Sequence, residues 1–383
     1  MPACGPSTDR PAAASGAPVR AGEAAPAVLL LNFGGPRGLE EVSRFLYEIL
    51  RDPNTLQLPA PQGLQDLLAR RIAFRRSAEV ARQYAEIGGA SPIVAATARM
   101  AAALAARLSA RGLRIPVLAA HRYLPGHTRE TVARLIELGI GRILAVPLYP
   151  HFSWATTGSS AQQLQAELKR AGCGAEVLAL RSYPDLPGYV DALAARLRET
   201  LAGAGTPAQT VVLCSAHGLP ASYVARGDPY RFELYRTLDA LRARFPEWRF
   251  VLSFQSRVGP AEWLRPYTDQ ILSALAAQGT RHQVFLPLAF VNDHLETLYE
   301  IGHTYFAAAR ALGMTPHRVP AVEDDPAYMA ALAEWVEAAL AGRGAVGLGE
   351  LMPPDQSFRR VGLWVWSAWL AALSAALTNA LLR

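Results

Sequence analysis

Short runs of Val, Leu and Ile alternate along the chain with longer stretches in which apolar residues recur every three or four positions. The short runs are typical of buried parallel strands, and the longer stretches are typical of amphipathic helices. Their alternation predicts a doubly wound α/β protein. The predicted strands are Ala27–Asn32, Ile115–Ala120, Arg142–Tyr149, Thr210–Ser215, Phe250–Gln255 and Gln283–Leu288. The predicted helices are Leu39–Leu50, Val94–Ala110, Arg129–Leu138, Ala161–Ala171, Ala192–Leu201, Phe232–Phe245 and Leu295–Leu312.

At 383 residues, the chain is long enough for two domains with separate cores. Two segments resemble each other, LLLNFGGP at 29–36 and LCSAHGLP at 213–220, because each is a strand-like run that breaks into Gly and Pro. We therefore expect two similar domains, followed by a linker and an apolar helix. The expected divisions are a disordered leader at 1–26, domains at 27–178 and 179–342, the linker at 343–360 and the apolar helix at 361–382.

The segment Val361–Leu382 carries no charged residue and is long enough to span a bilayer. Two arginines precede it, and three tryptophans near its start are typical of a membrane interface. A buried helix rich in Ala and Ser is the alternative. We expect a cytoplasmic protein that this segment attaches to the cytoplasmic face of the inner membrane.

The net charge of +6 comes almost entirely from arginine, since Lys169 is the only lysine. The arginines are spread over the predicted helices, so nucleic-acid binding is not expected. Cys4, Cys173 and Cys214 lie far apart with no C-x-x-C pair. This spacing predicts neither a disulfide framework nor a thiolate zinc site, and it fits a reducing cytoplasm.

Polar residues gather just after the predicted strands. The carboxyl ends of strands in open α/β sheets face the ligand crevice, so these residues are expected to meet in a cleft between the domains. They are found at Asn32, 121–123, 149–151, 215–217, 255–257 and 292–296.

His217 and Glu296 are the main candidates for chemistry in these segments. The glycine and proline after His217 predict a turn that presents the imidazole, which can bind a metal ion or accept a proton. A histidine that only bonds a turn carbonyl is the alternative. Glu296 and Glu300 lie four residues apart on one face of a predicted helix, where they repel unless a cation lies between them. Alternatively, Glu300 is exposed and Asp293 is a helix N-cap.

An imidazole and a carboxylate without cysteine suit Fe²⁺, Zn²⁺ or Mn²⁺. Two protein ligands would hold the ion loosely, as an enzyme that consumes a metal ion requires. The G-x-G-x-x-G match at 342–347 follows a helical pattern, so a dinucleotide site is not expected. Covalent catalysis by Cys214 or Ser215 is not expected either, because no third activating group is evident.

Seven blocks between about residues 27 and 340 carry a more specific signal, because they occur in a fixed order. They are LLNFGGP at 30–36, IGGASPI at 87–93, RY at 122–123, YP at 149–150 with TTGSS at 156–160, SAHGLP at 215–220 with RGDPY at 226–230, FQSRVG at 254–259 with WL at 263–264, and FVNDHLETL at 290–298. In this order they resemble the ferrochelatase family.

The resemblance implies two Rossmann-like, chelatase-type domains with parallel sheets around a central cleft. It implies an enzyme that inserts Fe²⁺ into protoporphyrin IX to give protohaem, the last step of haem biosynthesis. His217 corresponds to the family's essential histidine and Glu296 to the facing glutamate, which are assigned to iron binding and removal of the pyrrole protons. Asp293 and His294 belong to the same block. The residues implied to line the porphyrin cleft opposite are Arg122, Tyr123 and Tyr149.

Two departures from the family pattern change the expected metal chemistry. Some members bind an iron–sulfur cluster, but Trp154 occupies the position of the first cysteine and no cysteine follows Cys214. We therefore expect no cluster and no tightly bound cofactor, with Fe²⁺ as a substrate. Thr304, with His303 beside it, replaces the next acidic residue of several relatives, so the outer metal path is expected to end at Glu300.

Three alternatives remain open from the sequence. A periplasmic-type binding protein also has two α/β lobes around a cleft, although no signal segment is evident. A cobalt chelatase acting on a precorrin is the alternative among enzymes. The motifs do not separate protoporphyrin from coproporphyrin, which differs only in its number of propionates.

Overall fold

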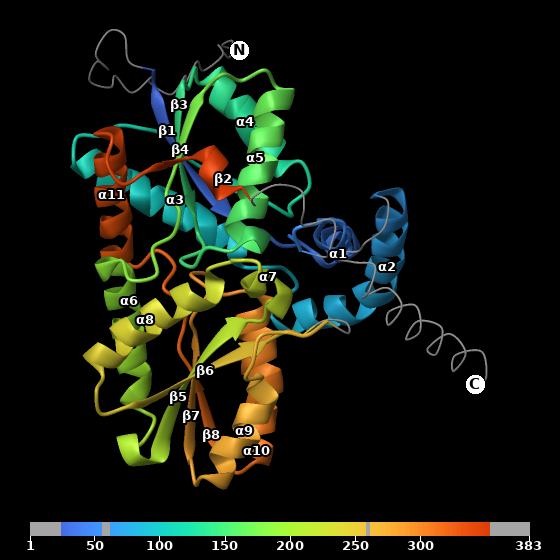
Figure 1. Ribbon diagram of the computed structural model, residues 1–383, viewed down its shortest axis with the longest axis vertical. Helices are drawn as coiled ribbons and strands as arrows, with labels where there is room; N and C mark the ends of the chain where they lie inside the picture. The colour runs from blue at the N-terminus through green and yellow to red at the C-terminus, as the bar shows by residue number, and fades with distance from the viewer. Residues whose placement is uncertain (1–23, 56–61, 258–260, 353–383) are drawn as a thin grey trace, which may run out of the picture.

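A computed structural model of the chain describes residues 24–55, 62–257 and 261–352. These residues form two α/β lobes that lie one above the other (Figure 1). The apolar segment 361–382, and all of the expected leader except its last three residues, lie outside the described residues.

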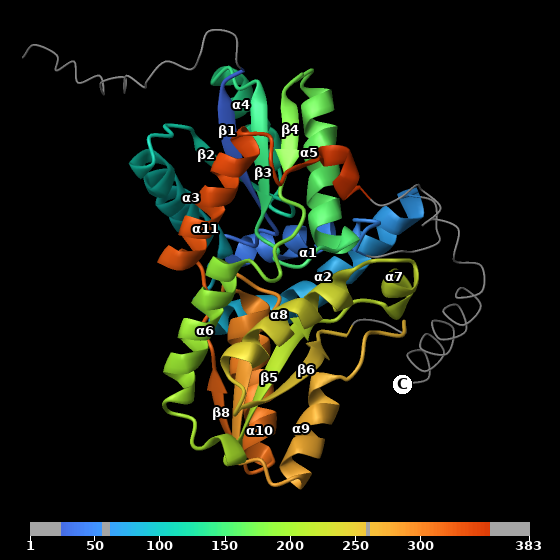
Figure 2. The same cartoon turned by 60° about the vertical axis from the view of Figure 1, so that its left-hand side comes forward.

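The first lobe is built on a five-stranded sheet in the order β2-β1-β3-β4-β9, with parallel pairing except between β4 and β9. Residues 27 to 31 of the central strand are almost fully buried, because helices cover both faces of the sheet (Figure 2). The strands are β1 (Pro26–Asn32), β2 (Val117–His121), β3 (Arg142–Pro147), β4 (Glu176–Ala179) and β9 (Val346–Gly347). The helices are α3 (Ile93–Ala110), α4 (His127–Glu137) and α5 (Ser159–Arg170).

The second lobe is built on a four-stranded parallel sheet in the order β6-β5-β7-β8. Its central strand β5 occupies the same place as β1 in the first sheet, which is the relation that the two similar sequence segments suggested. The strands are β5 (Thr210–His217), β6 (Arg249–Gln255), β7 (His282–Pro287) and β8 (Thr315–Arg318). The helices are α6 (Pro187–Leu201), α7 (Ala221–Ala225), α8 (Tyr230–Arg244), α9 (Thr268–Ala277) and α10 (Phe306–Ala311).

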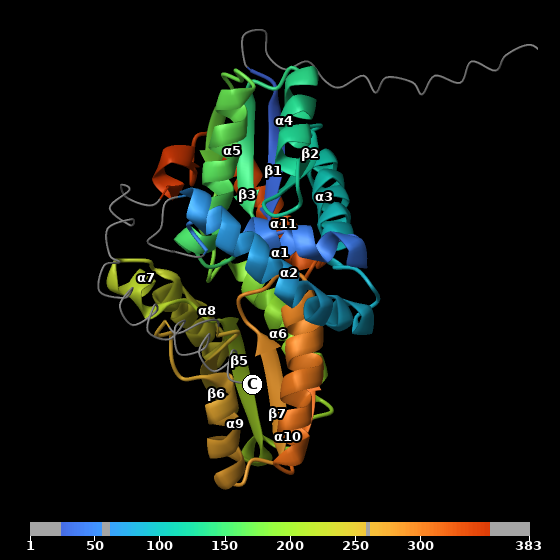
Figure 3. The same cartoon turned by 90° about the vertical axis from the view of Figure 1, so that its right-hand side faces the viewer.

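Two further helices, α1 (Val42–Leu50) and α2 (Gln62–Glu86), pack on each other at the junction of the lobes (Figure 3). Val42 of α1 and Tyr84 of α2 are buried in a small apolar cluster against which Leu295 of the second lobe packs. The pair α1–α2 therefore covers one side of the junction.

The α/β architecture with two mainly parallel sheets is confirmed, and the six predicted strands are present with ends shifted by at most two residues. The helix predicted over Leu295–Leu312 is confirmed, and its first part, η4 (Glu296–Tyr305), is a π-helix that continues into α10. A π-helix also repeats its side chains about every four residues, so the apolar pattern could not distinguish the two.

The prediction of a linker at 343–360 was wrong for residues 346–351, which form a strand and a turn of the first lobe. Strand β9 pairs with β4 of the first sheet, and Leu351 in the following turn η5 (Leu348–Leu351) is fully buried. The preceding helix α11 (Pro326–Leu340) packs on α6 and α3, hence on both lobes. The chain returns to the first lobe because apolar side chains of this segment complete the first lobe's core.

Among the described helices, α3 is the one that is long and apolar enough to cross a membrane. Its residues Met100, Leu104 and Leu108 are fully buried in the large apolar core. This burial identifies α3 as a core helix of the first lobe.

We predict that Leu104→Ala lowers the free energy of unfolding by about 2–5 kcal/mol, because the change leaves a cavity in a packed core. The matched control is Leu67→Ala on α2, where the side chain is 63% exposed and the expected change is within about 0.5 kcal/mol. Urea unfolding followed by tryptophan fluorescence measures both. Equal stabilities for the two variants would contradict the assignment of α3 to the core.

Candidate active site

The carboxyl ends of the two sheets meet through the segments that follow β1 and β7. The Asn32 side chain, at the end of β1, donates a hydrogen bond of 2.8 Å to Asn292 Oδ1 and another of 2.8 Å to Thr97 on α3. Asn32 and Asn292 are both buried, although they lie 260 residues apart in the chain. This contact brings the block that contains Glu296 to the edge of the first sheet.

His217 is the last residue of β5, and its side chain is 38% exposed. Its Nδ1 lies 2.5 Å from the carbonyl oxygen of Gly218. A carbonyl can only accept, so Nδ1 carries the hydrogen and the neutral ring has its lone pair on Nε2. Gly218 is required here, because a Cβ would lie 2.8 Å from the Gln255 carbonyl oxygen and 3.0 Å from the Trp263 ring. The local turn thus fixes both the tautomer and the direction of His217.

Glu296, the first residue of η4, faces His217 with 3.8 Å between Oε1 and the imidazole Nε2. Its other oxygen, Oε2, lies 3.5 Å from Nε2 of His294 and has no hydrogen-bond partner among the described residues. Burial alone would raise the pKa of this carboxyl. The positive charges that His217 and His294 carry when protonated, together with the His294 Nε2 group 3.5 Å away, outweigh burial and lower the pKa to about 2. Glu296 is therefore a carboxylate at neutral pH.

Glu300 lies one turn further along η4 and is held by four donors. Gln255 Nε2 donates to Oε2 at 3.0 Å, the Ser256 amide to Oε1 at 3.0 Å, the Ser256 hydroxyl to Oε2 and the Tyr305 hydroxyl to Oε1 at 3.1 Å. Burial and the nearby Glu296 charge raise the pKa of the Glu300 carboxyl. Glu300 is therefore not freely exposed, and each of its two carboxylate oxygens already accepts hydrogen bonds within the protein.

Gln255 is a site residue whose particular role the sequence did not indicate. It accepts a hydrogen bond of 2.5 Å from Ser215 and donates to the backbone carbonyl of Glu296 at 3.2 Å as well as to Glu300. A backbone carbonyl oxygen has two lone pairs, so Gln255 can bond the Glu296 carbonyl in addition to a hydrogen bond within the helix, and it ties the end of β6 to the start of η4. The only sequence signal for this role was the position of Gln255 at the end of a buried strand.

The two other residues of the block support Glu296 from the side. Asp293 Oδ1 lies 2.6 Å from Arg318 Nη1 and accepts a hydrogen bond of 2.7 Å from Thr297, so it is bound within the protein. It is not the N-cap of the helix, which is Leu295 and has no side-chain cap. His294 Nδ1 lies 3.2 Å from the Asn292 carbonyl oxygen, which directs Nε2 toward Glu296.

Arg122, Tyr123 and Tyr149 direct their polar groups into the first lobe. Arg122 and the Tyr123 hydroxyl both bond to Asp52 at 2.7 Å, and the Tyr149 hydroxyl lies 3.2 Å from the Ser160 hydroxyl. Burial raises the pKa of both tyrosines. No described contact joins these three side chains to His217 or Glu296, and their expected contact with a porphyrin stays a prediction.

Other polar residues after the strands turn away from His217 and Glu296. His121 faces His127, with 4.8 Å between the ring centroids, and His151 is buried and bonded to Thr237 at 2.7 Å. Burial lowers the pKa of both His121 and His151 to about 3, so both rings are neutral. Arg257 pairs with Asp269 at the surface. Of the polar residues that were expected to meet in a cleft, those that lie close together are therefore His217, Gln255, the 292–296 segment and Asn32.

The site contains two groups that can act as metal ligands, the Nε2 atom of His217 and the carboxylate of Glu296. Metal–nitrogen and metal–oxygen bonds of about 2.1 Å add up to about 4.2 Å, so a divalent ion fits between atoms 3.8 Å apart with a bent angle. Among the described residues, no group of three or more His, Cys, Asp or Glu could hold a metal ion. The pair can bind an ion with partners from solvent or substrate, or can move a proton.

We predict that Glu296 stays ionised from about pH 3 to 6 in the folded protein and that His217→Ala raises its pKa toward the ordinary 4.5. Since the folded pKa is lowered, Glu296 stabilises the fold above pH 4.5 and this contribution is lost as the pH falls toward 2. Carbon-13 NMR of labelled glutamate side chains measures the titration. Glu300, whose pKa is raised, is the internal comparison, and a Glu296 signal that titrates with it would refute the prediction.

The ferrochelatase family model matches residues 25–340 of this chain. A ferrochelatase of Geobacter metallireducens is 40% identical over 314 residues, covering 82% of this chain and 98% of its own length. A ferrochelatase of Synechococcus sp. strain RCC307 is 38% identical over 322 residues, covering 82% of each chain. A solved structure of SirB from Bacillus subtilis with Fe³⁺ is 12% identical with a TM-score of 0.49, over 83% of this chain and 98% of that one. The chain belongs to the ferrochelatase family, whose members are enzymes that insert a metal ion into a porphyrin for haem synthesis.

Proposed function

We propose that this protein inserts Fe²⁺ into protoporphyrin IX to give protohaem, the last step of haem biosynthesis. The observation that carries the proposal is the facing pair of His217 Nε2 and Glu296 Oε1 at 3.8 Å, in an enzyme family that acts on Fe²⁺. The two donors leave coordination positions for the porphyrin nitrogens that finally receive the ion. A loosely held metal substrate requires such an incomplete site.

The substrate determines what the two residues have to do. A flat porphyrin hides its two N–H protons within the ring, so a metal ion can enter only when the ring is bent and a nitrogen lone pair points outward. Binding of the rest of the macrocycle supplies the energy for that bend. His217 would then accept a pyrrole proton at Nε2, whose lone pair is free because Nδ1 is bound to Gly218.

Glu296 would hold the ion and relay protons, since its carboxylate is charged at neutral pH and Oε2 has no hydrogen-bond partner among the described residues. Glu300 would have a lesser part, as the residue at which the outer metal path ends, because four donors already occupy its oxygens. Asp293 and His294 would orient Glu296 through the contacts described above.

We further propose that Arg122, Tyr123 and Tyr149 lie on the porphyrin side of the first lobe, as the family motif implies. The proposal includes no iron–sulfur cluster, because Trp154 stands at the position of the first cluster cysteine. Fe²⁺ is a substrate in this scheme, and no tightly bound cofactor is required.

The activity test is an anaerobic incubation of the full chain with Fe²⁺ and protoporphyrin IX, followed by visible absorbance of the haem product. Parallel reactions use coproporphyrin as the macrocycle, and Co²⁺ with sirohydrochlorin. Fastest turnover is expected for Fe²⁺ with protoporphyrin IX. Preference for Co²⁺ and sirohydrochlorin would instead identify a chelatase of the precorrin type.

We predict that His217→Ala lowers iron insertion by at least about 100-fold, because a general base contributes a factor of this size. Porphyrin binding, measured by quenching of porphyrin fluorescence, should remain detectable. The control is His317→Ala, which removes a histidine that pairs with His282 on the neighbouring strand of the second sheet. Near-normal activity of His217→Ala would rule out the proposed role.

We also propose that the enzyme is cytoplasmic and that the apolar segment Val361–Leu382 attaches it to the inner membrane, where hydrophobic porphyrin accumulates. Removal of residues 361–383 is expected to move the protein from the membrane fraction to the soluble fraction. Immunoblots of both fractions test this. An unchanged distribution would contradict attachment through this segment.

A further inference from the structure

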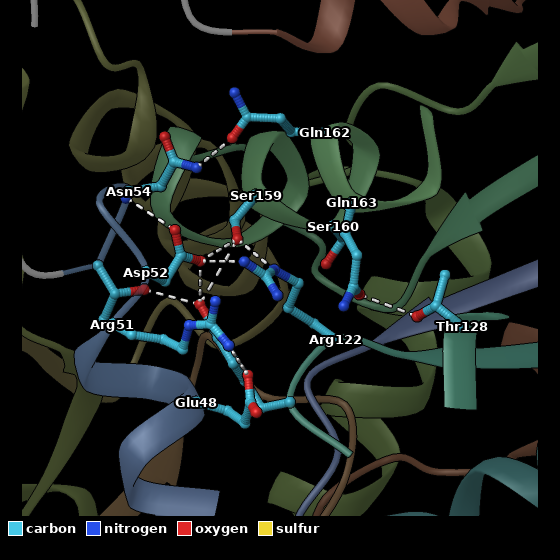
Figure 4. A network of polar contacts seen from close by, with 12 residues as sticks. Glu48, Arg51, Asp52, Asn54, Arg122, Thr128, Ser159, Ser160, Gln162 and Gln163 are labelled. Atoms are coloured by element: carbon cyan, nitrogen blue, oxygen red, sulfur yellow. Dashed lines mark hydrogen bonds and ion pairs between the residues drawn. The ribbon is translucent and has the colours of Figure 1, made fainter. Parts of the chain in front are cut away.

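A polar pocket with a volume of about 480 Å³ lies between α1 and the first lobe. Its walls come from α1, from the turn between β2 and α4, from the first turn of α4 and from α5 (Figure 4). Its lining residues belong to α1, to the residues that follow α1 and to the first lobe, and neither His217 nor Glu296 is among them. The pocket therefore lies apart from the His217–Glu296 pair, although it shares Arg122 with the proposed porphyrin side of the first lobe.

Arginine dominates the lining of this pocket. Three acidic side chains also line it, so the side chains leave an excess of two positive charges. The acidic residues are Glu48, Asp52 and Glu167. The arginines are Arg44, Arg51, Arg122, Arg129 and Arg170.

Ion pairs within the wall hold several of these arginines in place without neutralising them all. Arg129 and Arg170 share one carboxylate, Glu167, at 3.3 and 2.7 Å. Two guanidinium groups on one carboxylate leave one positive charge uncompensated and donors free on both arginines. The wall formed by α4 and α5 is thus prearranged for an anion.

Arg122 provides a rigid floor. Its Nη2 donates to Asp52 at 2.7 Å and its Nε donates to Ser159 at 2.7 Å. Figure 4 shows Arg122, Asp52 and Ser159 pointing toward one another. Asp52 is fully buried and also accepts the Tyr123 hydroxyl. A guanidinium has five N–H donors, so the remaining ones of Arg122 are available at the pocket surface. Little conformational freedom is lost when a ligand binds to a group held in this way.

The start of α4 adds to the positive potential. Gly126, its N-cap, has φ of 82° and no side-chain cap, and Thr128 and Arg129 of the first turn line the pocket. The first amides of a helix have no partner within the helix and carry the positive end of its dipole. Together with the arginines, they form a concave surface suited to oxyanions.

We propose that this pocket binds a small polyanion with two or more phosphate or carboxylate groups. Its lining is mostly polar, with Pro53, Leu124 and Pro125 as the larger apolar members, so a macrocycle is not the ligand that it fits. Its volume lies within the range of sites for small molecules. Arginine forks bind phosphate and carboxylate in the same bidentate geometry, which is why one chemistry covers both groups.

The test is isothermal titration of the full chain with inorganic pyrophosphate and, separately, with citrate. The matched variants are the double change Arg129→Gln/Arg170→Gln, which removes both charges from one wall, and Arg134→Gln on the same helix, which pairs with Glu137 outside the pocket. Arg129 and Arg170 are exposed, so the double variant should fold, and circular dichroism checks this.

We expect saturable binding at one site in the wild type and in Arg134→Gln, and at least about tenfold weaker binding in the double variant. Binding of pyrophosphate alone would identify a phosphate ligand, binding of citrate alone a carboxylate ligand, and binding of both a general polyanion site. The absence of saturable binding of either anion to the wild type would overturn the proposal. Equal affinity in the folded double variant would overturn it as well. Because the readout is binding, its outcome is independent of iron insertion.

Discussion

Buried polar contacts hold the carboxyl edges of the two sheets face to face, and the candidate site depends on them. Asn32 and Asn292 meet on one side of the junction. On another side, the segment after β3 donates backbone hydrogen bonds to two buried carboxylates, from Phe152 to Glu233 at 2.6 Å and from Trp154 to Asp228 at 2.9 Å. Breaking such a contact leaves a buried polar group without a partner, which costs more than the bond itself contributes. The relative position of the lobes is therefore well defined where β1, β3 and β7 end.

In this arrangement of the two lobes, the groups available for chemistry are polar atoms whose hydrogen-bonding capacity is not used within the protein. His217 donates from Nδ1 to its own turn, and Glu300 is surrounded by donors, whereas Glu296 Oε2 has no hydrogen-bond partner among the described residues. Buried polar atoms in proteins are almost always paired, so the carboxylate of Glu296, with Oε1 facing His217 Nε2 at 3.8 Å and Oε2 unpaired beside it, marks a place where a proton or an ion can reside. The π-helical start of η4 and the Gln255 side chain set this arrangement.

The apolar pattern was sufficient for the central strands, because β1, β5 and β7 are buried on both faces and consist of nearly continuous apolar runs. It did not reveal β4 and β8, which are short, nor the pairing of β9, whose two partner residues lie 167 and 169 positions earlier. The rule that polar side chains just after parallel strands lie near one another correctly predicted that His217 and Glu296 are close in space. The same rule also selected His121 and His151, which turn into the protein, because side-chain direction at a strand end depends on tertiary contacts that the pattern does not contain.

The return of β9 to the first sheet has a mechanical consequence. Within the part of the chain that the structure describes, the backbone passes between the lobes twice, once after β4 and once after β8, so the second lobe is an insertion fixed at both of its ends. A body held by two connections can bend about the line through them but cannot swivel freely. Movement of the second lobe relative to the first is thus restricted at both ends of the insertion, and α11, which packs against α6 and α3, links the two lobes at one of these ends.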